Sequence, residues 1–234
     1  MDDRSAGDGG GDGAGDGNGS PIKYTLRNET VSDYREVEEL TREAFWNLYV
    51  PGCDEHFLVH KMRSHPDFIP EMDFVAVAGK KIIGCIMFTK SYIQNGRGDR
   101  LGTLTFGPVC VSPDFQRMGI GSALIRKGIE KAKEDGYPAI IILGDPRNYC
   151  RHGFRNSKDY GISNGAGRFP YAQLALILDS EKLVGTDLRF FYSEVFSCDH
   201  DEAAIFDASF PNKEMRHESS QDIFSIQCRA FVDD

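Results

Sequence analysis

The pattern of apolar and polar positions predicts short strands and amphipathic helices along the chain from residue 21 onward. Apolar residues that alternate with polar ones indicate a strand, whereas apolar residues repeated every three or four positions indicate a helix. Pairs of proline and glycine end several of these segments. The predicted strands are residues 22–27, 74–78, 81–90, 101–111, 139–143 and 171–178, and the predicted helices are residues 33–50, 54–64, 120–135, 145–152, 202–210 and 220–231.

The order of these elements predicts an α/β (α+β) fold with a mixed sheet and helices on both of its faces. Residues 1–20 are almost entirely Gly, Asp, Ala and Asn, and such a segment cannot bury enough apolar surface to offset its ordering entropy. We therefore expect a disordered Gly/Asp tail at 1–20, a main domain at 21–180, and a C-terminal helical extension at 181–234 that packs on this domain.

Composition excludes some classes of partner. The formal net charge is −9, whereas proteins that bind a phosphate backbone usually carry a basic surface, so nucleic acid is not the expected partner. No apolar run reaches the length of a membrane span, and the N-terminus has no apolar signal-like segment. We expect no membrane partner and a cytoplasmic location. The oligomeric state stays open, with a homodimer as one option.

Six scattered cysteines contain no Cys-x-x-Cys pair, which favours reduced and mostly buried thiols. Cys198 and His200 are two neighbouring metal-ligating residues, but no second ligand pair follows at a useful spacing. His56 and His60 share a helix face without a carboxylate partner. We therefore expect no metal.

Candidate chemistry is concentrated in residues 111–132, which read VSPDFQRMGIGSALIRKGIEKA. An apolar strand leads into a loop with Gln116 and Arg117, then two glycines, then a helix. The first N–H groups of a helix have no partner within it, and the helix dipole places partial positive charge there. Gly119 and Gly121 allow an anion to approach the backbone closely, so the sequence predicts a phosphate site.

Two nucleotide-binding patterns do not fit this loop. The dinucleotide fingerprint needs a small residue where Leu124 stands, and a P-loop needs a Gly-Lys-Ser/Thr tripeptide that is missing. The pattern Gln-x-x-Gly-x-Gly at 116–121 resembles motif A of the GCN5-related N-acetyltransferases (GNAT superfamily). Residues 149–154, YCRHGF, resemble the downstream Tyr-x-x-x-Gly-Phe of that family.

The resemblance spans about residues 22–178, and the hairpin at 74–89 stands where the family has its second and third strands. It is closer still to a bacterial-type group of predicted N-acetyltransferases, through the stretches EHFLVHKMR, VAVAGKKIIGCI, FGPVCVSPDFQRMGIGSALI and ILGDPRNYCRHGF. One departure is Cys85, which stands where a His is expected after Gly84.

The resemblance implies acetyl-CoA as co-substrate and a mostly antiparallel sheet that splays at the cleft for this molecule. Gly107-Pro108 gives a physical reason for the splay, because proline removes a ladder donor. By resemblance, the pyrophosphate contacts are Gln116, Arg117, Met118, Gly119, Ile120, Gly121 and Ser122, and the strand contacts to the pantetheine arm are Val109, Cys110 and Val111. Tyr149 is the implied acid that protonates the departing thiolate.

The expected reaction is direct acetyl transfer to a primary amine, of a small molecule or a protein, through a ternary complex. The base is left unassigned among Glu55, Glu71, Asp73 and water. A covalent acetyl-Cys110 route is the minor alternative in mechanism. Two alternatives in function stay open: a non-catalytic acetyl-CoA sensor or interaction module, and a transferase of a longer acyl group.

Overall fold

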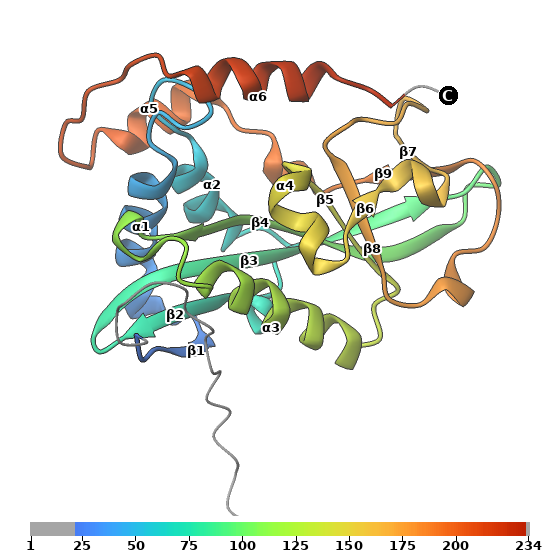
Figure 1. Ribbon diagram of the computed structural model, residues 1–234, viewed down its shortest axis with the longest axis horizontal. Coiled ribbons are helices and arrows are strands. Elements are labelled where there is room, and N and C mark those ends of the chain that lie inside the picture. The colour runs from blue at the N-terminus through green and yellow to red at the C-terminus, as the bar shows by residue number, and fades with distance from the viewer. Residues whose placement is uncertain (1–21, 233–234) are drawn as a thin grey trace, which may run out of the picture.

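The computed structural model describes residues 22–232, and within them nine strands form one sheet in the order β1-β2-β3-β4-β5-β8-β6, with β9 joined to β3 and β7 (Figure 1). The tail predicted at 1–20 lies outside the described residues. The strands are β1 (Thr25–Asn28), β2 (Phe74–Ala78), β3 (Lys81–Gln94), β4 (Arg100–Val111), β5 (Ala139–Leu143), β6 (Arg155–Asn156), β7 (Ile162–Asn164), β8 (Gln173–Ile177) and β9 (Leu188–Phe191). The helices are α1 (Tyr34–Phe45), α2 (Glu55–Met62), α3 (Ile120–Glu134), α4 (Pro146–Tyr149), α5 (His200–Asp207) and α6 (Ser219–Arg229).

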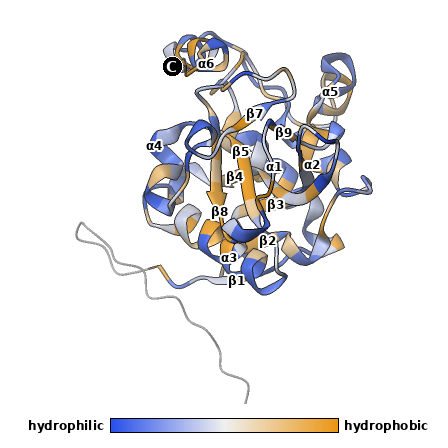
Figure 2. Cartoon of the chain, turned by 90° about the vertical axis from the view of Figure 1, so that its right-hand side faces the viewer, coloured by the Kyte–Doolittle hydropathy of each residue, from blue (hydrophilic) through white to orange (hydrophobic). Residues whose placement is uncertain are grey.

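The sheet is mostly antiparallel, which confirms the predicted fold class. Only the β4–β5 and β7–β9 pairs run parallel within the described residues. In Figure 2, α3 and α4 lie on one side of the sheet, α1, α2 and α5 lie on the other, and α6 crosses one end. This arrangement leaves both faces of the central strands covered.

Alternation along the strands divides the core between the two faces. On β5, Ile140 and Ile142 belong to the cluster that packs under α3, while Ala139 and Ile141 pack against β7 and β9. A third cluster joins α1 and α2 to the opposite face of β2, β3 and β4. Because successive strand side chains point to opposite faces, the central strands β2, β3, β4, β5 and β8 each contribute to at least two clusters.

Several elements differ from the sequence-based expectation, among them the short strands β6 and β7, which were not predicted. Helix α1 ends at Phe45 rather than near the predicted stop at Pro51-Gly52, because Trp46 leaves the helical backbone and Asn47 has a positive φ of 59°. The segment after residue 180 is not wholly helical, because β9 forms in it and extends the sheet beside β3. Short strands with only two buried apolar residues carry little periodic signal, as in β9.

The cysteines are free, but only Cys53, Cys85 and Cys110 are buried; Cys198 is half-buried, and Cys150 and Cys228 are exposed. The expectation of mostly buried thiols is therefore correct for half of them. Across residues 22–232, no helix has both the length and the apolar character needed to cross a bilayer.

Candidate active site

Strands β4 and β5 separate toward their carboxyl ends. They run parallel but pair only where Leu104 lies beside Ile140, and β4 then continues to Val111. The register between β3 and β4 shifts between Ile86 and Phe88, opposite Gly107-Pro108, where the proline offers no N–H to the ladder. The distortion expected at this dipeptide is therefore present, and it opens the sheet beside the last residues of β4.

The backbone groups of β4 alternate between β3 and the opening. Ser112 N donates to Ile83 O at 2.9 Å, just beyond the last paired residues of the two strands. In an antiparallel pair, hydrogen-bonded and non-hydrogen-bonded positions alternate, so Cys110 also bonds to β3, while Val109 and Val111 turn their N–H and C=O away from it. We therefore assign the free strand positions to Val109 and Val111, and not to Cys110.

The Cys110 thiol lies in the core beneath α1. Its Sγ is 3.5 Å from Cys85 Sγ and 3.8 Å from the Thr41 hydroxyl, and the residue is 6% exposed. Hydrogen bonding to Cys110 and burial both raise the pKa of Cys85, so the Cys85 thiol is protonated. Cys110 is buried beside it and faces Thr41 of α1, so its sulfur is enclosed in the core, which argues against an acetyl-Cys110 intermediate.

The loop before α3 forms a concave set of backbone donors. Arg117 and Gly119 both have left-handed backbones, with φ of 64° and 81°. The first helical bond runs from Ala123 N to Gly119 O, so the N–H groups of Ile120, Gly121 and Ser122 have no partner within the helix. Successive donors in such a turn make an anion-binding concavity.

The loop adjoins the open end of β4. A Cβ at Gly121 would lie 3.5 Å from Val111 Cγ2, and Gln116 Nε2 lies 3.4 Å from Val111 O. Ile120 is buried and fixes the start of α3 against the sheet, whereas Gln116, Arg117 and Met118 are exposed. All the predicted pyrophosphate contacts therefore lie in one segment that continues directly from Val109 and Val111.

Further basic groups surround the start of α3. His152 Nε2 lies 3.4 Å from the Ser122 hydroxyl. Burial lowers the pKa of His152, and the positive charges of Arg151 and Arg126 lower it further, which places three basic side chains together. The sequence reasoning did not single out these residues. Arg126 stands four positions after Ser122 on the same helix face, which is the signal that could have found it.

Tyr149 ends α4, close to the carboxyl end of β5. Asp145 caps this short helix by accepting a hydrogen bond from Arg147 N at 3.0 Å. The Tyr149 ring packs 5.7 Å from Phe106 of β4 and 6.1 Å from Phe154, measured between ring centroids. Burial raises the pKa of Tyr149, and the nearby Tyr49 and Asp145 raise it further, so the phenol keeps its proton at neutral pH.

The three carboxyl groups considered as bases lie in different places. Glu71 is exposed, and Asp73 is buried at the start of β2, where burial and a hydrogen bond with Glu29 raise its pKa. Glu55 is the first residue of α2, and burial raises its pKa to about 7.

Tyr49 lies within electrostatic range of Glu55 on α2 and of Asp145 and Tyr149 near α4. Burial raises the pKa of Tyr49, and the charges of Glu55 and Asp145 raise it further. Since Tyr49 in turn affects Tyr149, these four side chains form one electrostatically coupled group. The sequence reasoning missed Tyr49, because a lone tyrosine in a loop belongs to no motif.

Solved structures share this architecture. The GNAT family N-acetyltransferase YhbS from Escherichia coli, in complex with CoA, has a TM-score of 0.63 at 23% identity, over 77% of this chain and 96% of that one. A GNAT family acetyltransferase from Brucella melitensis, in complex with acetyl-CoA, has a TM-score of 0.58 at 24% identity, over 75% of this chain and 99% of that one. At these identities the likeness shows a common fold.

Sequence comparisons identify the family. A model of the acetyltransferase (GNAT) family matches residues 39–154. The Escherichia coli K12 protein named "Uncharacterized N-acetyltransferase YjhQ" is 30% identical over 131 residues, 56% of this chain and 69% of that protein. YhbS of the same strain is 28% identical over 130 residues, 55% of this chain and 72% of that protein. The chain belongs to the GNAT family of acetyltransferase enzymes.

Proposed function

We propose that the chain transfers an acetyl group from acetyl-CoA directly to a primary amine, through a ternary complex. The observation that carries this proposal is the continuity of three features: the donor-rich start of α3, the free backbone edge at Val109 and Val111, and the phenol of Tyr149. Together they match, in order, the diphosphate, the pantetheine amides and the sulfur of one extended acetyl-CoA molecule.

The start of α3 suits the pyrophosphate chemically. The free N–H groups of Ile120, Gly121 and Ser122 point out of the helix start, and the helix dipole adds to their attraction for an anion. Arg117, with the other basic groups near α3, supplies positive charge. Val109 and Val111 then pair with the pantetheine amides as an added strand would.

The residues at the sheet opening divide the chemistry between them. The N–H of Val109 or Val111 polarises the thioester carbonyl as an oxyanion donor. The amine nitrogen attacks this carbonyl carbon, a C–N bond forms, and the C–S bond breaks. Tyr149 donates its proton to the departing thiolate, which leaves as CoA thiol.

Glu55 takes the proton that the amine loses. Of the three carboxyl groups considered from the sequence, it is the one coupled to Tyr49 and through it to Tyr149. A base works best when its pKa is near the working pH, and burial brings the pKa of Glu55 to about 7. Glu55 then gives up this proton to water, and the Tyr149 phenolate takes a proton from water, so that both groups are restored before the next turnover.

Thiol release tests the proposal. The purified full chain is mixed with acetyl-CoA and a panel of amines, and free CoA thiol is measured with and without each amine. We expect release that depends on at least one amine and leaves an acetylated amine in equal amount. Release without an acetylated amine would overturn direct transfer, and tight acetyl-CoA binding without any release would favour the sensor. Comparing acetyl-CoA with longer acyl-CoA donors tests the remaining alternative.

Three further expectations belong to this proposal. The free cysteines suit the reducing cytoplasm. The domain division at residue 180 stays a prediction, and so does the homodimer.

A further inference from the structure

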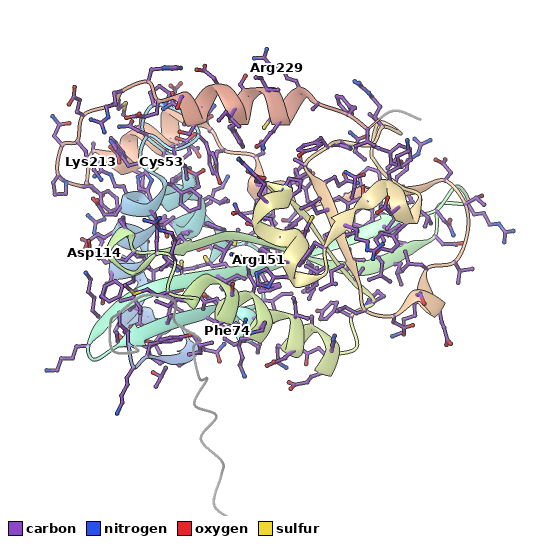
Figure 3. All side chains as sticks on the ribbon, in the orientation of Figure 1. Cys53, Phe74, Asp114, Arg151, Lys213 and Arg229 are labelled. Carbon is purple, nitrogen blue, oxygen red and sulfur yellow. The ribbon has the colours of Figure 1, made fainter. Side chains whose placement is uncertain are left out.

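Helix α6 crosses one end of the sheet, away from α3, and it is attached at both of its ends (Figures 1 and 2). At its N-terminal end, Gln221 Nε2 donates to Asn47 O at 3.0 Å, and the Phe224 ring stacks on Tyr49 with centroids 4.5 Å apart. Both contacts are to the segment that joins α1 to α2. Figure 3 labels Lys213 ahead of α6 and Arg229 in its last turn.

The C-terminal end of α6 is held by the segment before β8. Tyr171 N donates to Ala230 O at 2.9 Å, and Val232 N donates to Phe169 O at 2.8 Å. The Arg168 guanidinium lies 3.3 Å from the centroid of the Phe231 ring. Helix α6 therefore bridges two segments, the loop between α1 and α2 at one end and the segment before β8 at the other.

The middle of α6 reaches the reacting end of the site. The Arg147 guanidinium bonds to Asp145 and holds the pKa of this carboxyl below its usual value, and the nearby Gln227 side chain of α6 lowers it further. Asp145 is close enough to Tyr149 to affect its pKa. Phe224 and Gln227 therefore form a face of α6 that lies next to Tyr49 and Asp145. Both of these residues are near the phenol of Tyr149.

A pocket of about 330 Å³ lies beside the C-terminal attachment of α6. Its lining is mostly apolar and aromatic: Leu143, Ala166, Pro170, Phe190, Phe191 and Tyr192 contribute to it. By strand alternation, Leu143 at the end of β5 shares the face of Ala139 and Ile141, which is opposite α3. Pro170 also forms a β-bridge with Phe231, so the attachment of α6 borders the pocket.

Side-chain contacts lead from the lining of the pocket to the distorted part of β4. Tyr192 contacts Phe196, with ring centroids 6.0 Å apart, and Phe196 Cε1 lies 3.5 Å from the position of a Cβ at Gly107. An acceptor bound here would enter from the face opposite the phosphate site and would reach the sheet opening at the end of β5. This is the direction that a ternary complex requires.

We propose that α6 encloses the acceptor side of the cleft, and that the acceptor is a small primary amine with an aromatic or apolar body held in this pocket. The inference rests on the proposed function and specifies its substrate class. A volume of about 330 Å³ is in the range of small-molecule sites. The rings bury the body of the amine, while its amino group extends past Leu143 toward the sheet opening. A pocket of this size holds a small molecule rather than the surface of a folded protein.

Substrate comparison is the first test. The full chain is assayed with 2-phenylethylamine, with spermidine, and with a lysine-containing peptide and histone protein. We expect kcat/KM for 2-phenylethylamine to exceed that for the other acceptors by at least about tenfold, because they lack an apolar body of this size. Equal or better acetylation of the peptide or histone would overturn the inference.

Two variants test the pocket and the cover. Leu143 is 54% exposed, so Leu143→Arg is expected to fold; it fills the pocket and repels an ammonium group. KM for 2-phenylethylamine is expected to rise about tenfold with KM for acetyl-CoA unchanged, whereas the exposed Ile205→Arg control on α5 changes neither. Phe224→Ala removes the ring contact between α6 and Tyr49, and we expect it to lower the ratio of kcat/KM for the small amine to kcat/KM for the peptide. Ile226→Ala, at an exposed position of α6, is the control and is expected to leave this ratio unchanged. An unchanged amine KM in Leu143→Arg would overturn the inference.

Amine binding separates this inference from the proposed function. Calorimetry measures the binding of 2-phenylethylamine to the CoA-saturated chain and to Leu143→Arg. Binding that Leu143→Arg weakens supports the pocket even where thiol release fails, and in that case only the proposed transfer is overturned. Failure of the amine to bind the wild-type complex overturns the pocket.

Discussion

A Cβ atom at position 144 would lie 2.4 Å from Cε2 of Tyr149. Gly144 follows the last residue of β5, and Tyr149 ends α4 five residues later. The absence of a side chain at 144 therefore lets the phenol ring pack over the end of the strand, where the sheet opens. The position of the proposed acid depends on this close approach, rather than on any hydrogen bond to the hydroxyl group.

Gly144→Ala tests that dependence. The added methyl group must displace the Tyr149 ring, so kcat is expected to fall by about tenfold or more while the Kd for acetyl-CoA changes little. Gly102→Ala, at the other end of β4, adds a methyl group to open space and is expected to change neither. Steady-state kinetics with calorimetry compares the two variants, and an unaltered kcat in Gly144→Ala would show that the ring position does not matter.

Tyr149→Phe removes the proton donor and keeps the ring contacts with Phe106 and Phe154. We expect kcat to fall by about 100-fold, with nearly unchanged affinity for acetyl-CoA, because a positioned acid contributes about that much. The measurement is thiol release at saturating acetyl-CoA. Full activity in this variant would mean that water or another group protonates the thiolate.

Gly121→Glu places bulk and negative charge at the phosphate site. The Cβ itself fits, since its nearest neighbour is Val111 Cγ2 at 3.5 Å, so the fold is expected to persist while acetyl-CoA binding is lost. Gly102→Glu makes the same charge change away from α3 and serves as the control. Circular dichroism checks folding and calorimetry measures binding; equal affinity in the two variants would remove the phosphate assignment.

Glu55→Gln tests the base through pH. The base must be ionised to act, and burial raises the pKa of Glu55 to about 7, so wild-type kcat/KM is expected to rise as pH increases through 7. The variant is expected to lose most activity and this rise. A rise through neutral pH that persists in Glu55→Gln would assign the base to another group.

The same shift has a consequence for stability. Because the pKa of Glu55 is raised on folding from 4.5 to about 7, its contribution to stability is fully present below 4.5 and is lost as pH rises through 7. Glu55→Gln is therefore expected to be more stable, relative to wild type, at pH 8 than at pH 4. The free energy of unfolding of both proteins at the two pH values measures this difference.

Gly128→Ala tests the packing of α3 on the sheet. A Cβ at this position would lie 2.3 Å from Cζ of Phe88, which is fully buried and cannot move aside freely. We expect a loss of about 1–3 kcal/mol in the free energy of unfolding, which is typical of overpacking. Thermal unfolding measures the loss, again with Gly102→Ala as the control. A melting temperature equal to wild type would mean that Phe88 repacks without cost.

The parts of the site that depend on local sequence could be predicted, and the parts that depend on distant contacts could not. The loop at 116–122 and Tyr149 are marked by glycine spacing and by a short motif; the loop adjoins the end of β4 and Tyr149 packs against Phe106 of the same strand, while their roles stay predictions. The register with β3 then showed that Val109 and Val111, rather than Cys110, turn their backbone groups away from β3.

The acceptor side has no comparable local signal. Glu55 stands out from Glu71 and Asp73 only through its neighbour Tyr49, which lies in the preceding loop. The amphipathic pattern predicted a helix at 220–231, close to the observed α6, but not the face of the molecule that it covers. That position follows from contacts such as Phe224 with Tyr49, which join residues 175 positions apart.

Calorimetric titration of the purified full chain with acetyl-CoA, beside Gly121→Glu, tests the central claim most directly. The account predicts one saturable site per chain with micromolar affinity in the wild type, and no measurable binding in the variant. Absence of wild-type binding would mean that residues 116–122 are only the start of a helix, and would contradict the account.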